Sequence, residues 1–236
     1  MSEKILLDID EILKRCLELS DESYLKNVKA LVPTSWEIIG VRTPDIRRFA
    51  SEYSKQIKLK SDFQAIINYL DESFKRRNLT LVALGLEIIN KRSALLDRTI
   101  LANIKKWIPS LSDWAVADGI AITLTSRLLK EGLVELKDID FLKKHTNVFG
   151  RRIYIVSMVR PLRSIDCDIR SFLSETENFI PEQDKYIYKA ISWVLREGTR
   201  HFPKEISAFL EKHSRDLHHS VVREVRNKLE TGKKNR

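Results

Sequence analysis

The chain has 236 residues, and 43% of them are hydrophobic, which is enough to bury a sizeable core and argues against disorder. It contains only 7 Gly and 6 Pro, whereas a β-sandwich or barrel needs many tight turns and normally has more of both. Lys and Arg number 42 against 33 Asp and Glu, a net charge of +9. This excess attracts polyanions, although a basic surface that only keeps a protein soluble has the same composition.

Neither the cysteines nor the histidines are spaced as metal ligands. Cys16 and Cys167 lie far apart and form no CxxC motif, and the 5 histidines show no paired-ligand spacing. We therefore expect no metal, no cofactor and no disulfide framework, and a reducing cytoplasm as the location. No long apolar run is present, and acids interrupt the apolar pattern of residues 1–13, so we expect neither a membrane span nor a signal peptide.

Helix signals begin near the amino terminus and recur along the chain. Residues 10–19 are amphipathic. Thr43, Pro44 and Asp45 predict an N-cap, a proline at the first helical position and an early acid. Asp62 is expected to cap the helix that follows.

The later helices are predicted from a few start and stop residues. The run 153–159 is apolar, but its flanks have helical phasing, so we interpret it as buried helix and not as a strand. Further helices are expected over about 79–90, from Ser112–Asp113 to Lys130 with a stop at Gly132, over 151–159 before Pro161, from Pro181 to Gly198, and from Pro203 onward.

The number and spacing of these helices predict the fold class. About ten or more helices joined by connections of roughly 2–8 residues imply antiparallel pairs that stack on one another. The implied repeat is about 40 residues, as in HEAT and armadillo proteins. No linker divides the chain. We predict an all-α, HEAT-like or armadillo-like α-solenoid in a single monomeric domain over residues 1–236, with residues 233–236 as a frayed basic tail.

Trp114 and Asp118 are four residues apart in the segment DWAVAD, so they share a face of a helix. The core stripe of that helix is better formed by Ala117, Ile120, Leu124 and Leu128. A helical tryptophan is more often part of the core, and an aspartate is more often a solvated surface group. An indole and a carboxylate together outside the core stripe nevertheless indicate a site that is open to a ligand.

The segment KAISWVLREG places Trp193 on a helical face with three cations, Lys189, Arg196 and Arg200. An indole among cations suits an anionic ligand that also has a stackable or apolar part, such as a nucleic acid. The alternative is a tryptophan at the edge of the core, covered by the apolar stems of the arginines.

Arg151 and Arg152 open a helix, where free backbone N–H groups and guanidinium groups together bind phosphate; the alternative is a pair of solvated arginines. Arg152 follows Asp118 by 34 residues, and Trp193 follows Arg152 by 41, so each step is close to one repeat. Equivalent positions of successive repeats line up along one solenoid face. We therefore expect Trp114, Asp118, Arg152 and Trp193 to converge on one groove.

Four segments give the sequence a specific resemblance to the AlkD-type alkylpurine DNA glycosylases, within the DNA alkylation repair group of HEAT-like proteins. The resemblance extends over roughly residues 20–215. The segments agree with the family pattern in order and spacing, and KAISWVLREG is the most specific of them. They are GVRTPDIRRFA (residues 40–50), DWAVAD (113–118), NVFGRRIYIV (147–156) and KAISWVLREG (189–198).

The resemblance implies a C-shaped solenoid with a concave basic groove that binds duplex DNA and excises cationic N3- and N7-alkylated purines, without flipping the base into a deep pocket. By this resemblance, Trp114 and Asp118 occupy the catalytic positions. Arg152 binds a phosphate beside the lesion, and Trp193 is a second catalytic tryptophan. The further DNA contacts that we expect are Tyr24, Thr43, Arg47, Lys189 and Arg196.

The amino-terminal part departs from the family pattern. Tyr24, in the segment SYLKN, resembles a family tyrosine near the lesion strand. Several extra residues, including Pro33 and Trp36, separate it from Gly40. We expect this insertion to affect the range of substrates.

An alkylated purine is cationic, so it leaves without a general acid, and the protein needs negative charge and π density around the developing oxocarbenium ion. We expect Asp118 to supply that charge and to position water, in a cytoplasmic protein associated with the nucleoid. Two alternatives remain open. One is a non-catalytic HEAT-like binder of bent or branched DNA, and the other is a HEAT-type adaptor for protein partners.

Overall fold

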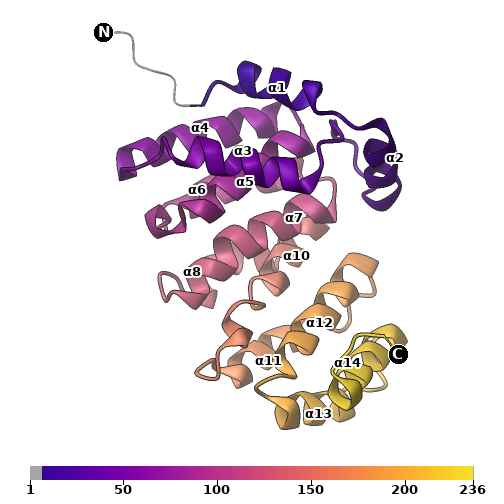
Figure 1. The fold of residues 1–236 in the computed structure, drawn as a ribbon. Helices are drawn as coiled ribbons and strands as arrows, with labels where there is room; N and C mark the ends of the chain where they lie inside the picture. Colours follow the sequence, from indigo (N-terminus) through magenta and orange to yellow (C-terminus); the bar gives the residue numbers. More distant parts are fainter. Residues whose placement is uncertain (1–6, 236) are drawn as a thin grey trace. The chain divides into compact units, whose positions relative to one another are not determined.

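The computed structural model describes residues 7–235, and all regular secondary structure within this range is helical (Figure 1). Its only β-type pairing is an isolated bridge between Glu37 and Asn78. None of the described helices is both long and apolar enough to cross a membrane. The helices are α1 (Ile9–Glu18), α2 (Glu22–Leu31), α3 (Thr43–Ser54), α4 (Lys60–Lys75), α5 (Leu79–Lys91), α6 (Ile100–Trp107), α7 (Trp114–Ile120), α8 (Ser126–Lys130), α9 (Asp140–Lys143), α10 (Val148–Val156), α11 (Ile169–Glu177), α12 (Lys185–Gly198), α13 (Pro203–Lys212) and α14 (His219–Thr231).

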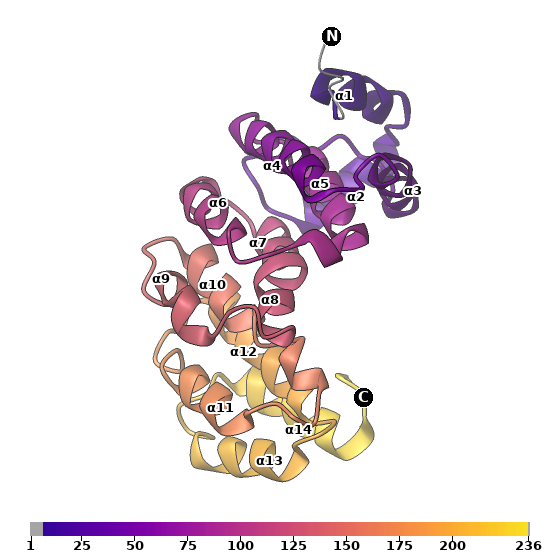
Figure 2. The ribbon, with the colours of Figure 1, turned by 90° about the vertical axis from the view of Figure 1, so that its left-hand side faces the viewer.

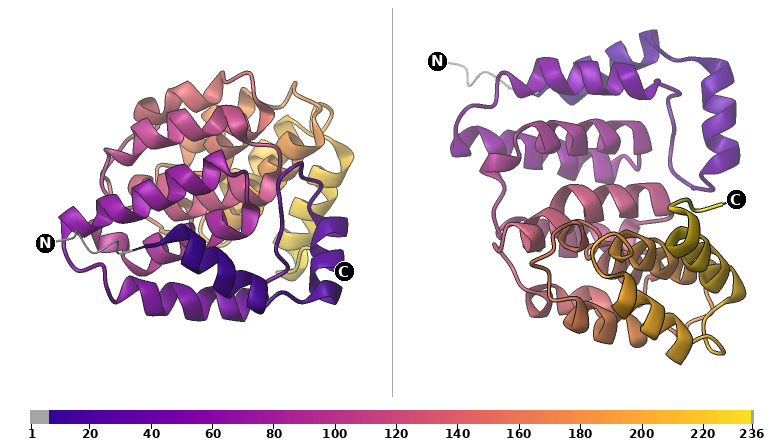
Figure 3. Two further views of the ribbon diagram at one scale, coloured as in Figure 1. Left: turned by 90° about the horizontal axis from the view of Figure 1, so that it is seen from above. Right: turned by 60° about the horizontal axis from the view of Figure 1, so that its bottom comes forward.

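The chain divides into two compact units, with the boundary between Leu124 and Thr125. In the first unit α3 packs on α5 and α5 on α7 in one layer, while α1 packs on α4 and α4 on α6 in the other (Figures 1 and 2). The same arrangement recurs in the second unit, where α10 packs on α12 and α12 on α14, while α11 packs on α13 (Figure 3). Two layers of alternating helices confirm the predicted α-solenoid. That the chain is a single domain stays a prediction.

Most helix boundaries were predicted to within a few residues, with three corrections. Asp62 is not the N-cap of α4. It lies inside the first turn, and its carboxylate accepts hydrogen bonds at 2.8 Å from the backbone N–H groups of both Lys58 and Leu59. Thr43 is the first residue of α3 and not its N-cap. Pro181 does not start α12, because Asp184 caps this helix by accepting the backbone N–H of Tyr186 at 2.7 Å.

The segment from Trp114 to Lys130 is helical throughout, as predicted, and Gly132 follows it in the left-handed conformation at φ 68°. The π-helical turn at Ala121–Thr125 was not predicted. The side-chain pattern gives no sign of this wider turn, because Ile120, Leu124 and Leu128 keep the four-residue spacing of an ordinary core stripe, and all three are buried.

The carboxyl-terminal residues follow α14 without regular structure. Lys234 Nζ lies 3.4 Å from Glu224 Oε1. The backbone N–H of Lys233 donates to Thr231 Oγ1 at 3.2 Å. Arg236, the last residue of the tail that we expected to fray, lies outside the described residues.

The insertion near Pro33 and Trp36 is a packing segment of the first unit. The Trp36 side chain is 5% exposed, meets the Phe74 ring edge-on at 5.4 Å, and donates from Nε1 to the backbone oxygen of Ser110 at 3.1 Å. Phe74 in turn stacks on Trp107 at 4.7 Å. The insertion is therefore held against the residues that precede α7.

The same insertion stabilises the first turn of α7. Asp113, the N-cap, is 0% exposed, and its Oδ1 accepts the backbone N–H of Val116 at 2.9 Å. Its Oδ2 accepts the Thr34 hydroxyl at 2.8 Å. A buried carboxylate is stable only when its oxygens receive donors. The start of α7 therefore depends on Thr34, a residue 79 positions earlier in the chain.

Thr34→Val should lower the free energy of unfolding by about 1–3 kcal/mol, because it keeps the shape of the side chain and leaves a buried carboxylate oxygen without its donor. Urea titration at neutral pH measures the loss. Thr34→Ser, which keeps the hydroxyl, should restore most of the stability, and Ser35→Ala on the exposed neighbouring residue is the control. Equal stability of Thr34→Val and the wild type would contradict the role of Thr34.

Candidate functional site

Trp114 and Asp118 lie outside the core of the first unit, as predicted. Both side chains are partly exposed on α7. The other face of the helix is buried through Val116, Ala117 and Ile120. The indole and the carboxylate are therefore accessible on one helical face, while the opposite face anchors the helix.

The two acids of the segment DWAVAD have different environments. Asp113 is completely buried and engaged in capping α7, as described above. Asp118 is partly exposed, one turn into the helix. Of the two, only Asp118 has a carboxylate that a ligand can approach without breaking a helix cap.

A cavity of about 250 Å³ adjoins this helix within the first unit. Its walls come from α2, the segment 38–41, α3, α5 and α7. On α7 the cavity is lined by Val116 and by Ala115 and Gly119, the residues directly after Trp114 and Asp118. A Cβ at position 119 would lie 2.9 Å from Leu86 Cδ1 on α5, so a larger residue there would displace the end of that side chain. The small residues at 115 and 119 thus leave room beside the Trp114–Asp118 face.

The same cavity brings together two of the predicted nucleic-acid contacts. Tyr24 on α2 and Thr43 at the start of α3 both line it, and their hydroxyl oxygens are 3.2 Å apart. The Arg42 guanidinium lies 5.9 Å from the centre of the Tyr24 ring and is ion-paired with Asp21 at 2.6 Å. Arg47 is exposed one turn further along α3. Despite the insertion, Tyr24 therefore stands beside Thr43 and the wall that α7 contributes.

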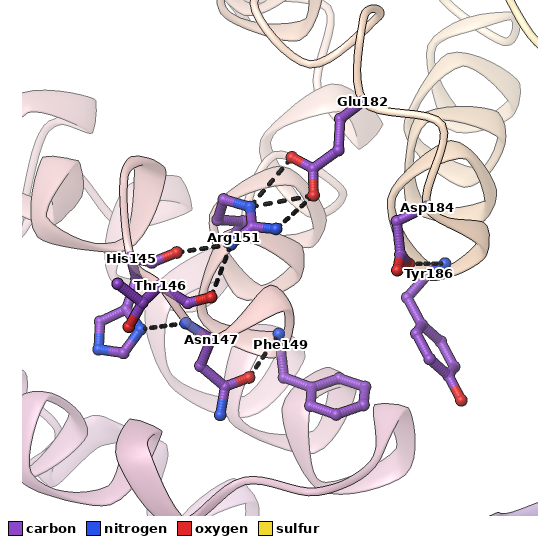
Figure 4. A network of polar contacts seen from close by, with 8 residues as sticks. All are labelled: His145, Thr146, Asn147, Phe149, Arg151, Glu182, Asp184 and Tyr186. Carbon is purple, nitrogen blue, oxygen red and sulfur yellow. Dashed lines mark hydrogen bonds and ion pairs between the residues drawn. The ribbon is translucent and has the colours of Figure 1, made fainter.

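In the second unit, Arg151 is bound internally (Figure 4). Its guanidinium is ion-paired with Glu182 and also donates to the backbone oxygens of His145 at 2.6 Å and Thr146 at 3.0 Å. The hydrogen bonds to Glu182 raise the pKa of Arg151 above its ordinary value. Arg151 therefore joins the connection before α10 to the one before α12 and is not a solvated phosphate ligand.

Arg152 is the more deeply placed of the two arginines, with only 6% of its surface exposed. Its Nη1 donates to the backbone oxygen of Tyr186 at 2.6 Å. The Tyr186 ring packs against Phe149 with centroids 5.0 Å apart, which holds the start of α12 against α10 (Figure 4). The hydrogen bond to the Tyr186 carbonyl orients the Arg152 guanidinium. Its role in gripping a phosphate stays a prediction.

Trp193 lies on α12 and is partly exposed. Its Nε1 donates to Glu197 Oε1 at 3.1 Å, and Glu197 also pairs with Arg163 at 3.0 Å. The residues predicted to bury the other face of α12 are all buried, namely Ile187, Ala190, Ile191 and Val194. The indole is thus held at the surface by a carboxylate one turn away.

The three cations expected around Trp193 differ in their environments. Arg196 Nη1 lies 2.6 Å from Glu224 Oε2 on α14, and both side chains are mostly buried. Within residues 7–235, Lys189 and Arg200 are exposed and form no ion pair. The sequence did not reveal that Glu224 neutralises Arg196, because Glu224 is 28 residues away.

We predicted that Trp114 and Asp118 meet Arg152 and Trp193 in one groove. The first two residues belong to one unit and the last two to the other, and their meeting stays a prediction.

Arg196→Gln should lower the free energy of unfolding by about 2 kcal/mol near neutral pH, because it leaves Glu224 with one charged partner fewer. Burial opposes the ionisation of Glu224, but the hydrogen bonds from Ser192 and Arg196 outweigh it and lower the pKa. A carboxyl group whose pKa is lower in the folded than in the unfolded state stabilises the fold at pH values above the ordinary pKa of Glu. This stabilisation is lost as the pH falls through the lowered pKa. The difference between variant and wild type should therefore shrink in acid.

Urea titrations between pH 3 and pH 7 measure this effect. If Arg196→Gln keeps full stability and binds DNA more weakly, the ion pair with Glu224 is not the main role of Arg196. Arg196 would then be a DNA contact, as the resemblance implies.

The family model described as DNA alkylation repair enzyme matches residues 12–229, which is most of the chain. A comparison with curated proteins found no match. The matched range includes every site residue discussed above, from Tyr24 to Glu224. The chain therefore belongs to the family of DNA alkylation repair enzymes.

Proposed function

We propose that the protein is a DNA glycosylase that hydrolyses the N-glycosidic bond of N3- and N7-alkylated purines in duplex DNA. One observation above all supports this within a family of DNA alkylation repair enzymes: α7 presents a partly exposed indole and carboxylate on one face. The neighbouring acid, Asp113, is reserved for the helix cap, so Asp118 is the acid of this segment that can face a substrate.

The chemistry requires little from the protein because the substrate is already activated. Alkylation at N3 of adenine or N7 of guanine makes the base cationic, so it departs with the bonding electron pair as a neutral purine. Positive charge then develops on the deoxyribose, as in other glycosyl transfers. Water adds to C1′ and loses a proton. Asp118 stabilises the developing oxocarbenium ion electrostatically and orients that water.

The indoles and the arginine act on the sugar–phosphate backbone. Trp114 and Trp193 cover the sugar and exclude bulk water, and each favours the cation by about 1–2 kcal/mol when desolvated. Arg152 holds a phosphate of the damaged strand through a guanidinium whose orientation is fixed by the Tyr186 carbonyl. Thr43 and Arg47 on α3, Tyr24 on α2 and Lys189 on α12 contact the strands nearby.

Asp118→Asn should reduce release of 7-methylguanine and 3-methyladenine from methylated duplex DNA by about 10²–10³-fold, because the amide has similar size and no negative charge. Affinity for the same duplex should change by less than about twofold. The assay is chromatographic identification of the released bases under single-turnover conditions, and fluorescence anisotropy measures binding. Asp113→Asn is the matched control, and its main effect should be a loss of stability.

Two results would contradict this mechanism. Full activity of Asp118→Asn would remove Asp118 from the mechanism. A wild-type protein that releases no base and still binds bent or branched DNA would support the non-catalytic alternative.

Arg152→Gln should weaken binding to damaged duplex and lower the slope of log K against log salt by about one, because one phosphate contact is lost. Binding is measured between low and physiological salt, after denaturant titration has shown that the variant is folded. Arg151→Gln is the paired control, which should lose stability and keep the wild-type slope. Identical slopes for Arg152→Gln and the wild type would show that Arg152 touches no phosphate.

A further inference from the structure

The last helix carries a stripe of polar and basic residues on the side away from its packing partner. Val221 and Val225 are 0% exposed, and between them Glu224 pairs with Arg196 of α12, so this side packs on α12. The opposite side follows the three- and four-residue spacing of one helical face. We call it the α14 stripe, and its residues are His219, Val222, Arg223, Arg226, Asn227 and Glu230.

The α14 stripe forms one wall of an open hollow of about 460 Å³ within the second unit. The turn between α13 and α14 forms the other wall and contributes Arg215. Arg215, Arg223 and Arg226 thus border one concave surface, and all three are exposed. Glu230, at the carboxyl-terminal end of the stripe, is its only acid.

These three arginines differ from Arg151 and Arg196 of the same unit, which are ion-paired with Glu182 and Glu224. Within residues 7–235, Arg215, Arg223 and Arg226 form neither an ion pair nor a side-chain hydrogen bond, whereas Arg48, for example, pairs with Asp45 on its own helix at 2.9 Å. Arg223 and Arg226 are three residues apart, so their like charges lie on adjacent positions and destabilise the isolated helix. Such an arrangement is stabilised when an anion binds across it.

We propose that the α14 stripe, with Arg215, binds the phosphodiester backbone of duplex DNA as a second contact that does not depend on the lesion. This inference rests on the proposed function, which makes duplex DNA the substrate. It adds a binding surface to which neither Trp114 nor Asp118 contributes.

The geometry of the helix fits a strand of phosphates. Arg223 and Arg226 are offset by about 4.5 Å along the helix axis, and phosphates on one DNA strand recur about every 3.4 Å along the duplex axis. Flexible arginine side chains at this offset reach neighbouring phosphates, and each guanidinium can bind a phosphate with two hydrogen bonds. Asn227, beside Arg226, adds a neutral donor of the kind that contacts phosphate oxygens.

A membrane surface fits the same charges less well. Binding to lipid requires exposed large apolar side chains beside the basic ones. In the described part of the chain such side chains are Leu17, Leu19, Leu31, Leu59, Leu133 and Ile165, and none of them belongs to the hollow. Leu217, which lines the hollow, is 6% exposed.

The test is the double variant Arg223→Gln/Arg226→Gln, assayed on an undamaged 20-base-pair duplex by anisotropy across a range of salt concentrations. We expect the slope of log K against log salt to fall by about 1.8 and affinity at low salt to fall by about 10- to 100-fold. The matched control is Arg170→Gln/Lys204→Gln, which removes the same charge from two exposed residues of the second unit that have no ion pair within residues 7–235. The control should change the slope by less than half a unit.

Three outcomes would overturn the proposal: an unchanged slope in the double variant, an equal loss in the control, or a loss confined to binding of phosphatidylserine vesicles. The readout on undamaged DNA separates this inference from the proposed catalysis. The wild type could release no base while the double variant still lowers the slope of log K against log salt. That result would support DNA binding by the α14 stripe and contradict the proposed glycosylase activity.

Discussion

The structure depends on a packing constraint: the helices of a layer bury one side against a neighbouring helix of the same layer, as α3, α5 and α7 do in the first unit and α10, α12 and α14 in the second. A helix in such an arrangement has one face left for anything other than core packing. On α7 that face holds Trp114 and Asp118, on α12 it holds Trp193, and on α14 it holds the basic stripe. The candidate site is therefore a consequence of which helix sides remain unburied, and it requires no specialised loop.

The helical fold and the core-facing residues were predictable because they follow from periodicity. Ala117, Ile120, Leu124 and Leu128 were expected in the core of one helix from their spacing alone, and all are buried. The helix starts were less predictable, since several side chains can cap the same turn. Asp62 shows this, because it satisfies two backbone N–H groups from inside its own helix and not from the position before it.

Long-range charge pairing explains most of what the sequence did not predict about the site. Arg151 and Arg196 look like ligands for phosphate when only their own helices are considered, yet Glu182 and Glu224 neutralise them from 31 and 28 residues away. No local pattern predicts which carboxylate will approach which arginine. The α14 stripe was not predicted for the converse reason, because only the structure shows that Arg215, Arg223 and Arg226 have no ion pair within residues 7–235.

The hydrogen bond from Thr34 to Asp113 has a consequence for engineering. It couples a surface connection in the amino-terminal part of the chain to the angle at which α7 begins, and hence to the direction in which Trp114 and Asp118 project. Changes in the length or composition of that connection will therefore reorient Trp114 and Asp118 from a distance. A library that randomises residues 33–36 therefore explores the orientation of α7 and of the two side chains for which we propose a catalytic role.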